Sequence, residues 1–254
     1  MLNYTKMFTN TAWGDCVDTI KHNKSLKKWY DVFEQLNYNV FRLPEVYSFN
    51  VVEMQEQIKN ITETHPTLSI IKNSSGTRFS KYRGLGFHAR RDSANPIFDH
   101  FTRRDKKLGV VYGDDLHLKN DLPELIEDDF TEPTEILNPY FKKVFSVFKS
   151  HITKASILEL RSGGWLGSHV DFPYYQGIRL HSTISGGESA WYEVAGEKFQ
   201  IPADGHWYFI DTGKYHSVYN YGPTHRTTLN INLNVYFDKK MTKDPKSLAQ
   251  AGLL

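Results

Sequence analysis

The most regular pattern in the chain is a series of short stretches in its C-terminal half in which apolar and polar residues alternate. Alternation with a period of two residues predicts β-strands that bury one face. The predicted strands are residues 155–161, 178–185, 189–194, 198–201, 206–211, 217–221 and 226–237. Turns, most of them containing glycine, are predicted between them at residues 163–164, 186–187, 195–196, 204–205, 212–213 and 222–223.

Many short strands at regular spacing are typical of β-sandwiches and barrels. Aromatic residues make up 14% of the chain and are concentrated in these stretches, and aromatic side chains suit a pleated, half-buried surface. We therefore expect a mainly β fold whose core is a double-stranded β-helix (jelly roll) over residues 155–237.

Helical spacing marks three segments of the N-terminal half. Apolar residues recur every three or four positions in residues 24–36, which predicts an amphipathic helix. A second helix is expected after Asn50, which suits an N-cap, and it should end before Pro66. A third is expected over residues 138–151, with Pro139 at its first helical position. We expect these helices to support the β core.

The segment between the second and third helices has little periodicity. Short strands are predicted at residues 68–71, within this segment, and at residues 39–43, before the second helix. Residues 77–104 mix glycine, aromatic residues and arginine, and we interpret them as a loop, either a mobile substrate loop or a solvated surface connection. A polar loop is expected to continue through residues 105–129. The arginines of this region are Arg78, Arg83, Arg90, Arg91, Arg103 and Arg104.

Length, charge and cysteine content narrow the class of protein. A chain of 254 residues is long enough for one β-rich domain, and we divide it into N-terminal helices with a possible substrate loop (1–154), a catalytic core (155–237) and a polar tail (238–254). A net charge of +2, from 31 basic and 29 acidic residues, argues against nucleic acid as a partner. The oligomeric state stays open.

A single cysteine, Cys16, rules out an internal disulfide and a multi-cysteine zinc site. No run of about 18 apolar residues occurs, so we expect no membrane span. We expect a soluble cytoplasmic protein.

A candidate metal site lies in the second half of the chain. His169 and Asp171 are two residues apart, and residues at that spacing in a strand point to the same face. We expect them at the start of a strand that follows a turn at residues 167–168. With His216 they would supply two imidazoles and a carboxylate, the facial triad that holds non-haem Fe(II) and leaves positions open. A His-x-Asp pattern is weak evidence by itself in a chain with 11 histidines.

Basic side chains accompany the candidate ligands. Arg226 begins a predicted strand, and a guanidinium fork suits a carboxylate that it can bind through two hydrogen bonds. Arg179 and His181 share one strand face by their two-residue spacing. These three side chains could bind an anion.

The ordered set HVD at 169–171, RLH at 179–181, His216 and Arg226 resembles the 2-oxoglutarate and Fe(II) dependent oxygenases of the aspartyl/asparaginyl β-hydroxylase-like superfamily, which includes free-amino-acid hydroxylases. The resemblance implies Fe(II) bound by His169, Asp171 and His216, with O2 and 2-oxoglutarate as cosubstrates. It also implies that Arg226 binds the distal carboxylate of 2-oxoglutarate, and Arg179 with His181 its iron-side carboxylate.

The resemblance also bears on the substrate. Asp171 is present where the animal aspartyl hydroxylases lack the carboxylate ligand, which is closer to the amino-acid hydroxylase branch and favours hydroxylation over halogenation. The implied activity is hydroxylation of an unactivated C–H bond in a small molecule or in an amino-acid or peptide side chain.

Two alternatives stay open. The chain could be a cupin-like jelly roll that binds a metal or another ligand without redox chemistry. It could also be an interaction protein that acts through the basic residues 78–107, in which case its affinity for an anionic partner should fall steeply with salt.

Overall fold

The structure is a computed structural model that describes residues 36–65, 69–70, 79–91, 93, 96–97, 102–105, 109–112, 130–169, 177–234 and 244–254. Its main helices are α4 (Val51–Thr64), α5 (Pro139–Phe145) and α6 (Pro245–Gln250). Its strands are β1 (Val40–Arg42), β2 (Ser69–Ile70), β3 (Phe79–Gly86), β4 (His88–Ala89), β5 (Thr102–Asp105), β6 (Gly109–Tyr112), β7 (Glu132–Pro133), β8 (His151–His169), β9 (Ile178–Ser185), β10 (Ala190–Val194), β11 (Glu197–Phe199), β12 (Tyr208–Ile210), β13 (His216–Asn220) and β14 (Arg226–Asn234).

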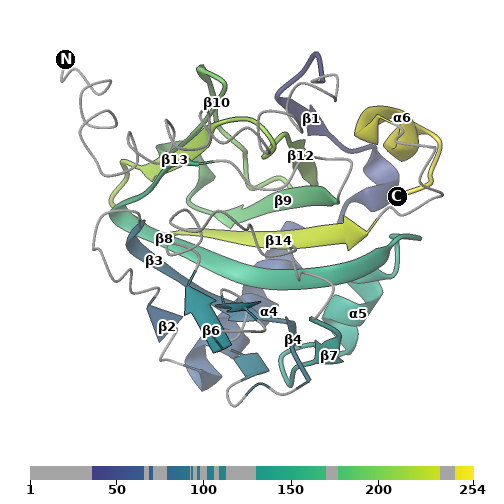
Figure 1. Ribbon diagram of the computed structural model, residues 1–254, viewed down its shortest axis with the longest axis vertical. Coiled ribbons are helices and arrows are strands. Elements are labelled where there is room, and N and C mark those ends of the chain that lie inside the picture. Colours follow the sequence, from purple (N-terminus) through teal and green to yellow (C-terminus); the bar gives the residue numbers. More distant parts are fainter. Residues whose placement is uncertain are drawn as a thin grey trace.

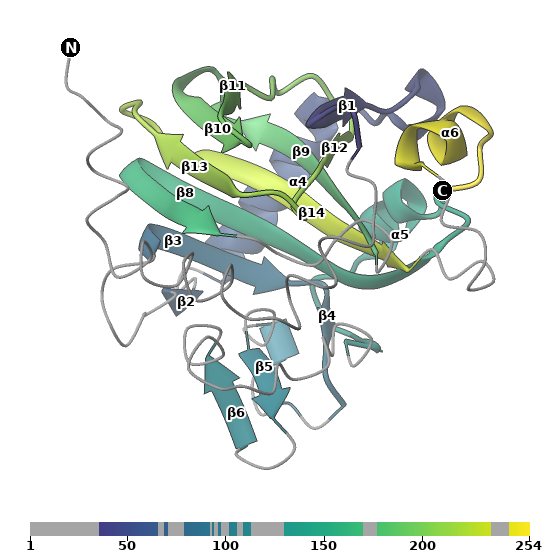
Figure 2. The same ribbon diagram turned by 45° about the horizontal axis from the view of Figure 1, so that its top comes forward.

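One strongly curled antiparallel sheet dominates the molecule (Figure 1). Its strand order is β1-β12-β9-β14-β8-β13-β10-β11, with β3 also paired to β8 and β2 paired to β3. The hairpin β5–β6 and the pair β4–β7 form two small separate sheets (Figure 2). The predicted mainly β, jelly-roll fold is confirmed.

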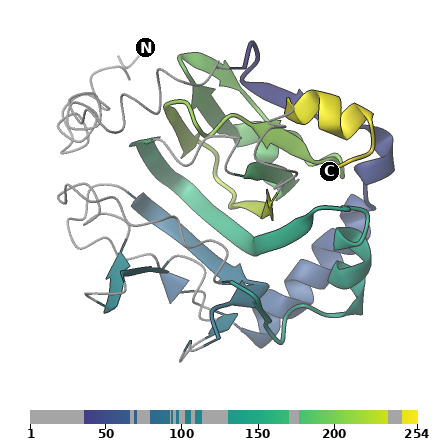
Figure 3. The same cartoon turned by 45° about the vertical axis from the view of Figure 1, so that its right-hand side comes forward.

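The long strand β8 belongs to both halves of the curled sheet. Its first part pairs with β14 and its last residues pair with β13, and the strand is sharply bent (Figure 3). The turn predicted at residues 163–164 was therefore wrong. Gly163 has a φ of 64°, which glycine adopts readily, so the chain passes through it and the strand continues. His169 consequently ends a strand instead of starting one.

The two faces of the sheet have different cores. The outer face packs against the helices, and its buried cluster includes Leu229 and Ile231 of β14 together with Met54 of α4, Phe141 of α5 and Trp207. The inner face carries a smaller apolar cluster. The inner cluster consists of Leu158, Leu160, Tyr192, Val194, Ile201, Tyr208, Ile210 and Val218. This alternation along each strand is what the period-two pattern predicted.

Two of the predicted helices are present and begin at the predicted caps. The Asn50 side chain accepts hydrogen bonds from the backbone N–H groups of Val52 and Glu53 at 3.0 and 3.2 Å. Asn138 does the same for the N–H groups of the second and third residues of α5. That helix ends at Phe145, six residues earlier than predicted. The helix predicted over residues 24–36 lies almost wholly outside the described residues.

The prediction of a loop over residues 77–129 was wrong for the part that forms strands β3, β4, β5 and β6. The sequence of β3 shows no apolar alternation. The strand is stabilised instead by its backbone pairing with β8 and by a charged pair that joins the two strands. Arg83 Nε of β3 donates to Glu159 Oε1 of β8 at 2.9 Å, and Leu85 is fully buried. A role for this region in substrate binding stays a prediction.

The strands that follow β8 agree with the pattern to within a few residues. Strand β9 has the predicted bounds, and β14 begins at Arg226 as predicted. The last three residues predicted for that strand lie outside the described part. In the part of the chain that the structure describes, no helix is long and apolar enough to span a bilayer.

Candidate functional site

The inner face of the sheet is polar where β14 and β9 cross it. Along β14, Leu229, Ile231 and Leu233 lie in the outer core, so Thr228, Asn230 and Asn232 alternate onto the inner face.

The strand register extends this polar surface across neighbouring strands. Asn230 is paired with His181 and Asn232 with Arg179, and Arg179 Nε donates to Asn232 Oδ1 at 3.0 Å. His181 is in turn paired with Tyr208 of β12, which belongs to the inner apolar cluster. Polar groups from three adjacent strands therefore share this face.

Tyr192 of β10 links Arg226 to His181. Arg226, only 4% exposed, donates to the Tyr192 hydroxyl and holds its guanidinium carbon 4.5 Å from the centre of the Tyr192 ring. The same hydroxyl lies 3.5 Å from His181 Nδ1. The hydroxyl accepts from Arg226, so its own proton can be donated to His181 Nδ1, although 3.5 Å is long for a hydrogen bond.

His181 is neutral at physiological pH. Burial lowers the pKa of His181 well below its usual value, and the charges of Arg179, Arg226 and His216 lower it further. A neutral imidazole that accepts at Nδ1 carries its proton on Nε2. The adjacent Asn230 amide favours the protonated form only slightly.

Three polar atoms of the inner face lack hydrogen-bond partners. Among the described residues, the buried atoms His181 Nε2, Asn230 Oδ1 and Thr183 Oγ1 make no hydrogen bond of good geometry, although the Asn230 amide lies close enough to His181 to raise its pKa slightly. Buried polar groups are normally satisfied, so a cluster of orphaned ones calls for an explanation. A donor at His181 Nε2 beside two arginines is suited to an anionic group.

The backbones of β13 and β8 bring His216 and His169 into register. They are direct register partners at the end of β8, as expected for a site closed across the sheet. His216 is buried, and its Nδ1 donates to the Lys214 carbonyl at 3.0 Å. That hydrogen bond selects the tautomer whose Nε2 carries the lone pair, the form that binds a metal ion.

The turn before His216 is fixed by a buried ion pair. Lys214 Nζ lies 3.2 Å from Asp211 Oδ2 and also donates to the Leu36 carbonyl and to Asn39 Oδ1. Burial raises the pKa of Asp211, and the Lys214 charge opposes that rise. Lys214 thereby ties the strand that carries His216 to the segment before β1.

The predicted site is thus partly assembled. Arg179, Arg226 and His216 each lower the pKa of His181 through their charge, and His169 is the register partner of His216. Asp171 lies outside the described residues. Within the described ranges, no group of three or more His, Cys, Asp or Glu side chains is placed to hold a metal ion. The metal triad stays a prediction.

The sequence did not identify Tyr192, Asn230 or Asn232 as site residues. The two asparagines could have been found, because they alternate with leucine and isoleucine along a strand whose other face is core. Tyr192 could not, since its position between Trp191 and Glu193 gives no sign that its ring turns inward.

No protein-family model matches the chain, and no curated protein matches it. Among solved structures, similar ones include a predicted oxalate decarboxylase from Thermotoga maritima, with 21% identity, coverage of 33% of this chain and 68% of that chain, and a TM-score of 0.28. A cupin 2 conserved barrel domain protein from Salinispora arenicola has 16% identity, covers 32% and 63%, and has a TM-score of 0.27. A cupin protein from Bacteroides fragilis has 20% identity, covers 35% and 71%, and has a TM-score of 0.28.

Proposed function

We propose that the inner face of the curled sheet binds Fe(II) and 2-oxoglutarate, and that the chain is a dioxygenase. Its substrate would be a small molecule or an amino-acid or peptide side chain with an unactivated C–H bond. The observation that carries the proposal is His216, whose Nδ1 is held by the Lys214 carbonyl and which lies opposite His169 in the strand register.

His169, Asp171 and His216 would hold the metal ion. Bound Fe(II), with 2-oxoglutarate and O2, supplies oxidative decarboxylation to succinate and CO2 coupled to hydroxylation of the substrate. The protein's part is to fix the ligand geometry and to exclude water. The Lys214 carbonyl contributes by holding the His216 ring in the tautomer whose Nε2 carries the lone pair.

The basic residues of the inner face would bind the cosubstrate. Arg226 is buried and stacked on Tyr192, so its guanidinium is fixed in place, as binding a carboxylate requires. Arg179 is positioned by Asn232, and neutral His181 offers a donor at Nε2 without adding a third positive charge. Together they suit a dianion with two separate carboxylates.

The proposal is tested by succinate formation from Fe(II), 2-oxoglutarate and O2 in the presence of candidate amino acids, peptides and nucleotides. We expect Asp171→Ala to abolish succinate formation and Arg226→Met chiefly to raise the 2-oxoglutarate concentration required. His225→Gln is a suitable control, because His225 is half-exposed on the surface. Full turnover by the Asp171→Ala variant would sink the metal assignment.

A second candidate function is a cupin-like jelly roll that binds a metal or a small polar ligand without redox chemistry. It is favoured by the orphaned atoms of His181, Asn230 and Thr183, which need a ligand but not iron. Thermal stabilisation by dicarboxylates that is equal with Fe(II) and with a chelator, together with no succinate from any substrate tested, would support this function over the first.

A further inference from the structure

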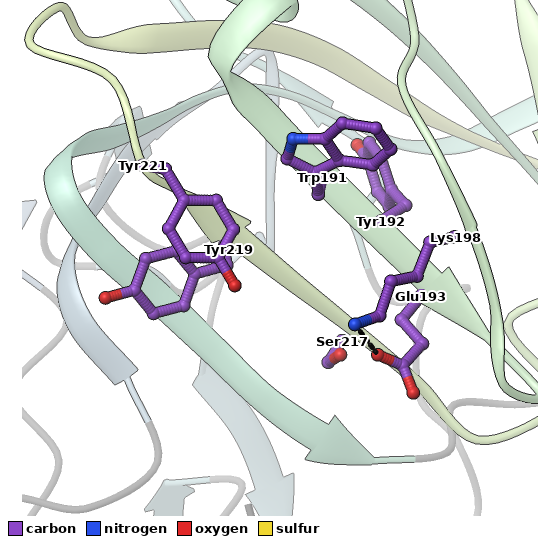
Figure 4. A pocket seen from close by; sticks show the side chains of 7 residues that line it. All are labelled: Trp191, Tyr192, Glu193, Lys198, Ser217, Tyr219 and Tyr221. Atoms are coloured by element: carbon purple, nitrogen blue, oxygen red, sulfur yellow. Dashed lines mark ion pairs between the residues drawn. The ribbon is translucent and has the colours of Figure 1, made fainter. Parts of the chain in front are cut away.

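A hollow lies on the outer side of the hairpin formed by β10, β11 and β13 (Figure 4). The register pairs Trp191 with Tyr219 and Glu193 with Ser217, so these four residues share the face opposite to Val218. The cavity volume is about 250 Å³. Its lining consists of Trp191, Tyr192, Glu193, Lys198, Ser217, Tyr219 and Tyr221.

Exposed aromatic rings form two walls of the hollow. Trp191 is 40% exposed and Tyr221 is 45% exposed, which is high for large aromatic side chains. Tyr219 and Tyr221 stack with ring centres 3.9 Å apart and an interplanar angle of 25°. Figure 4 shows the indole on one side and the two tyrosines on the other. Single exposed apolar side chains are common on protein surfaces, but a cluster of exposed aromatic rings in a hollow indicates a binding surface.

The charged groups of the hollow are one acid and one base. Lys198 Nζ lies 3.6 Å from Glu193 Oε2, which is too long for a good hydrogen bond, and both side chains are more than a third exposed. Each head group therefore retains hydrogen-bonding capacity. A cation would be repelled by Lys198 and an anion by Glu193, so the balanced pair favours a ligand without net charge.

We propose that this hollow is a carbohydrate-binding site that takes a single neutral sugar ring. The apolar C–H face of the ring would pack on Trp191, and its hydroxyl groups would bond to Glu193, Lys198 and Ser217. The volume is below the usual 300–1,000 Å³ of sites for drug-sized ligands, so it suits one ring. The inference does not depend on the proposed oxygenase activity, because Trp191, Glu193, Ser217 and Tyr219 lie on the face of the sheet opposite to the inner site. Tyr192 borders both sites.

The test is isothermal titration calorimetry of the full chain with methyl glycosides and tetrasaccharides of neutral hexoses, N-acetylglucosamine and xylose. We expect at least one of these sugars to bind, and Trp191→Ala to weaken its binding about tenfold. Trp191→Phe should retain most of the affinity, since it keeps an aromatic plane. Val46→Ala, which changes an exposed apolar residue elsewhere, should leave sugar binding unchanged.

Four results would overturn the proposal. The first is that no sugar of the panel binds, and the second is that sugar binding survives both Trp191→Ala and Tyr219→Ala. The third is that zwitterionic L-tryptophan binds more tightly than any sugar and that Glu193→Gln abolishes this binding. The fourth is that the chain self-associates in sedimentation and that Trp191→Ala abolishes the self-association. The last result would assign the surface to a second copy of the chain. Urea unfolding of each variant separates lost binding from lost folding.

Discussion

His181 illustrates how the polarity of one buried residue is set by its neighbours. Its pKa is depressed by burial first and by nearby positive charge second, so the ring is neutral. The Tyr192 hydroxyl fixes which nitrogen accepts, and Arg226 fixes the hydroxyl. The residue type alone indicates none of this, which is why the sequence identified His181 as a site residue but not as a neutral donor.

His88 makes a pH-dependent contribution to stability that can be measured. Burial lowers the pKa of His88 to about 4, and the nearby His151 acts in the same direction. In the unfolded chain the imidazole takes up a proton below about pH 6.5. The unfolded state therefore binds more protons between pH 6.5 and 4, so the free energy of unfolding falls as the pH is lowered through that range.

We expect this fall to amount to at most about 3 kcal/mol and to be absent from His88→Leu. Urea unfolding at pH 7.5, 5.5 and 4.5 measures it in the wild type and the variant. Val46→Ala, at an exposed and non-titrating position, is the control and should keep the wild-type dependence. If His88→Leu shows the same slope as the wild type, His88 is not the group responsible.

Two turns contain a glycine with positive φ, but they differ in the space that an added side chain would find. Gly196 has a φ of 85°, and a Cβ built there meets nothing within 4 Å. Gly205 has a φ of 78°, but a Cβ there would lie 2.2 Å from the Phe49 carbonyl oxygen. The two backbones lie this close because Phe49 N donates a hydrogen bond to the Gly205 carbonyl at 2.9 Å. This bond joins the segment before α4 to the segment before β12.

This pair gives a matched prediction. Gly196→Ala should lower the free energy of unfolding by about 1–2 kcal/mol, the cost of a left-handed conformation. Gly205→Ala should lower it by about 1–3 kcal/mol more, because the backbone at Phe49 must also move. Urea unfolding of both variants measures the difference. Equal losses would show that the contact with Phe49 yields without cost.

The elements that could be predicted are those whose own residues determine them. Both described helices that the sequence predicted begin at asparagine caps that bond their own first turns, so local chemistry was sufficient. Strand β3 was missed because its partner, β8, lies about 70 residues away and supplies both the backbone pairing and Glu159 for Arg83.

The same reasoning explains the outcome for the site. The alternation rule placed Arg179 with His181 correctly on one strand face, because that geometry is local. The bend of β8 was not predicted, since a glycine in a strand-like pattern is equally consistent with a turn and with a bulge. That bend carries β8 on to His169 and to its pairing with His216, so the closing of the site depended on the feature that the sequence left ambiguous.

In the whole molecule, the outer face of the sheet contributes most to stability, and we assign ligand binding to the inner face. The outer face is apolar and packs on α4 and α5, with Trp207 fully buried against Phe49 and Phe148. Among the described residues, unsatisfied buried polar atoms occur on both faces. They include single atoms of Ser182 and Trp207 on the outer side, but on the inner face they form a neighbouring group at His181, Asn230 and Thr183. A protein selected for stability alone would not keep them, because each orphaned buried group costs about 1–3 kcal/mol.

Thr183 and Ser182 test this division, because they are adjacent in β9 and point to opposite faces. Both are fully buried, and among the described residues neither hydroxyl has a hydrogen-bond partner. Ser182 is paired with Leu229 of the outer core, and Thr183 with Thr228 of the inner face. Thr183→Val keeps the side-chain shape and removes the orphaned hydroxyl, and Ser182→Ala removes the other.

We expect each substitution to raise the free energy of unfolding by up to about 1 kcal/mol, or to leave it unchanged, since an unsatisfied polar group is lost without a cavity of consequence. Only Thr183→Val should weaken the binding of 2-oxoglutarate or of another small carboxylate, measured by calorimetry with and without Fe(II). Destabilisation by Thr183→Val would mean that its hydroxyl is satisfied in solution. Equal effects of both variants on binding would contradict the assignment of ligand binding to the inner face, because Ser182 contacts only the outer side of the sheet.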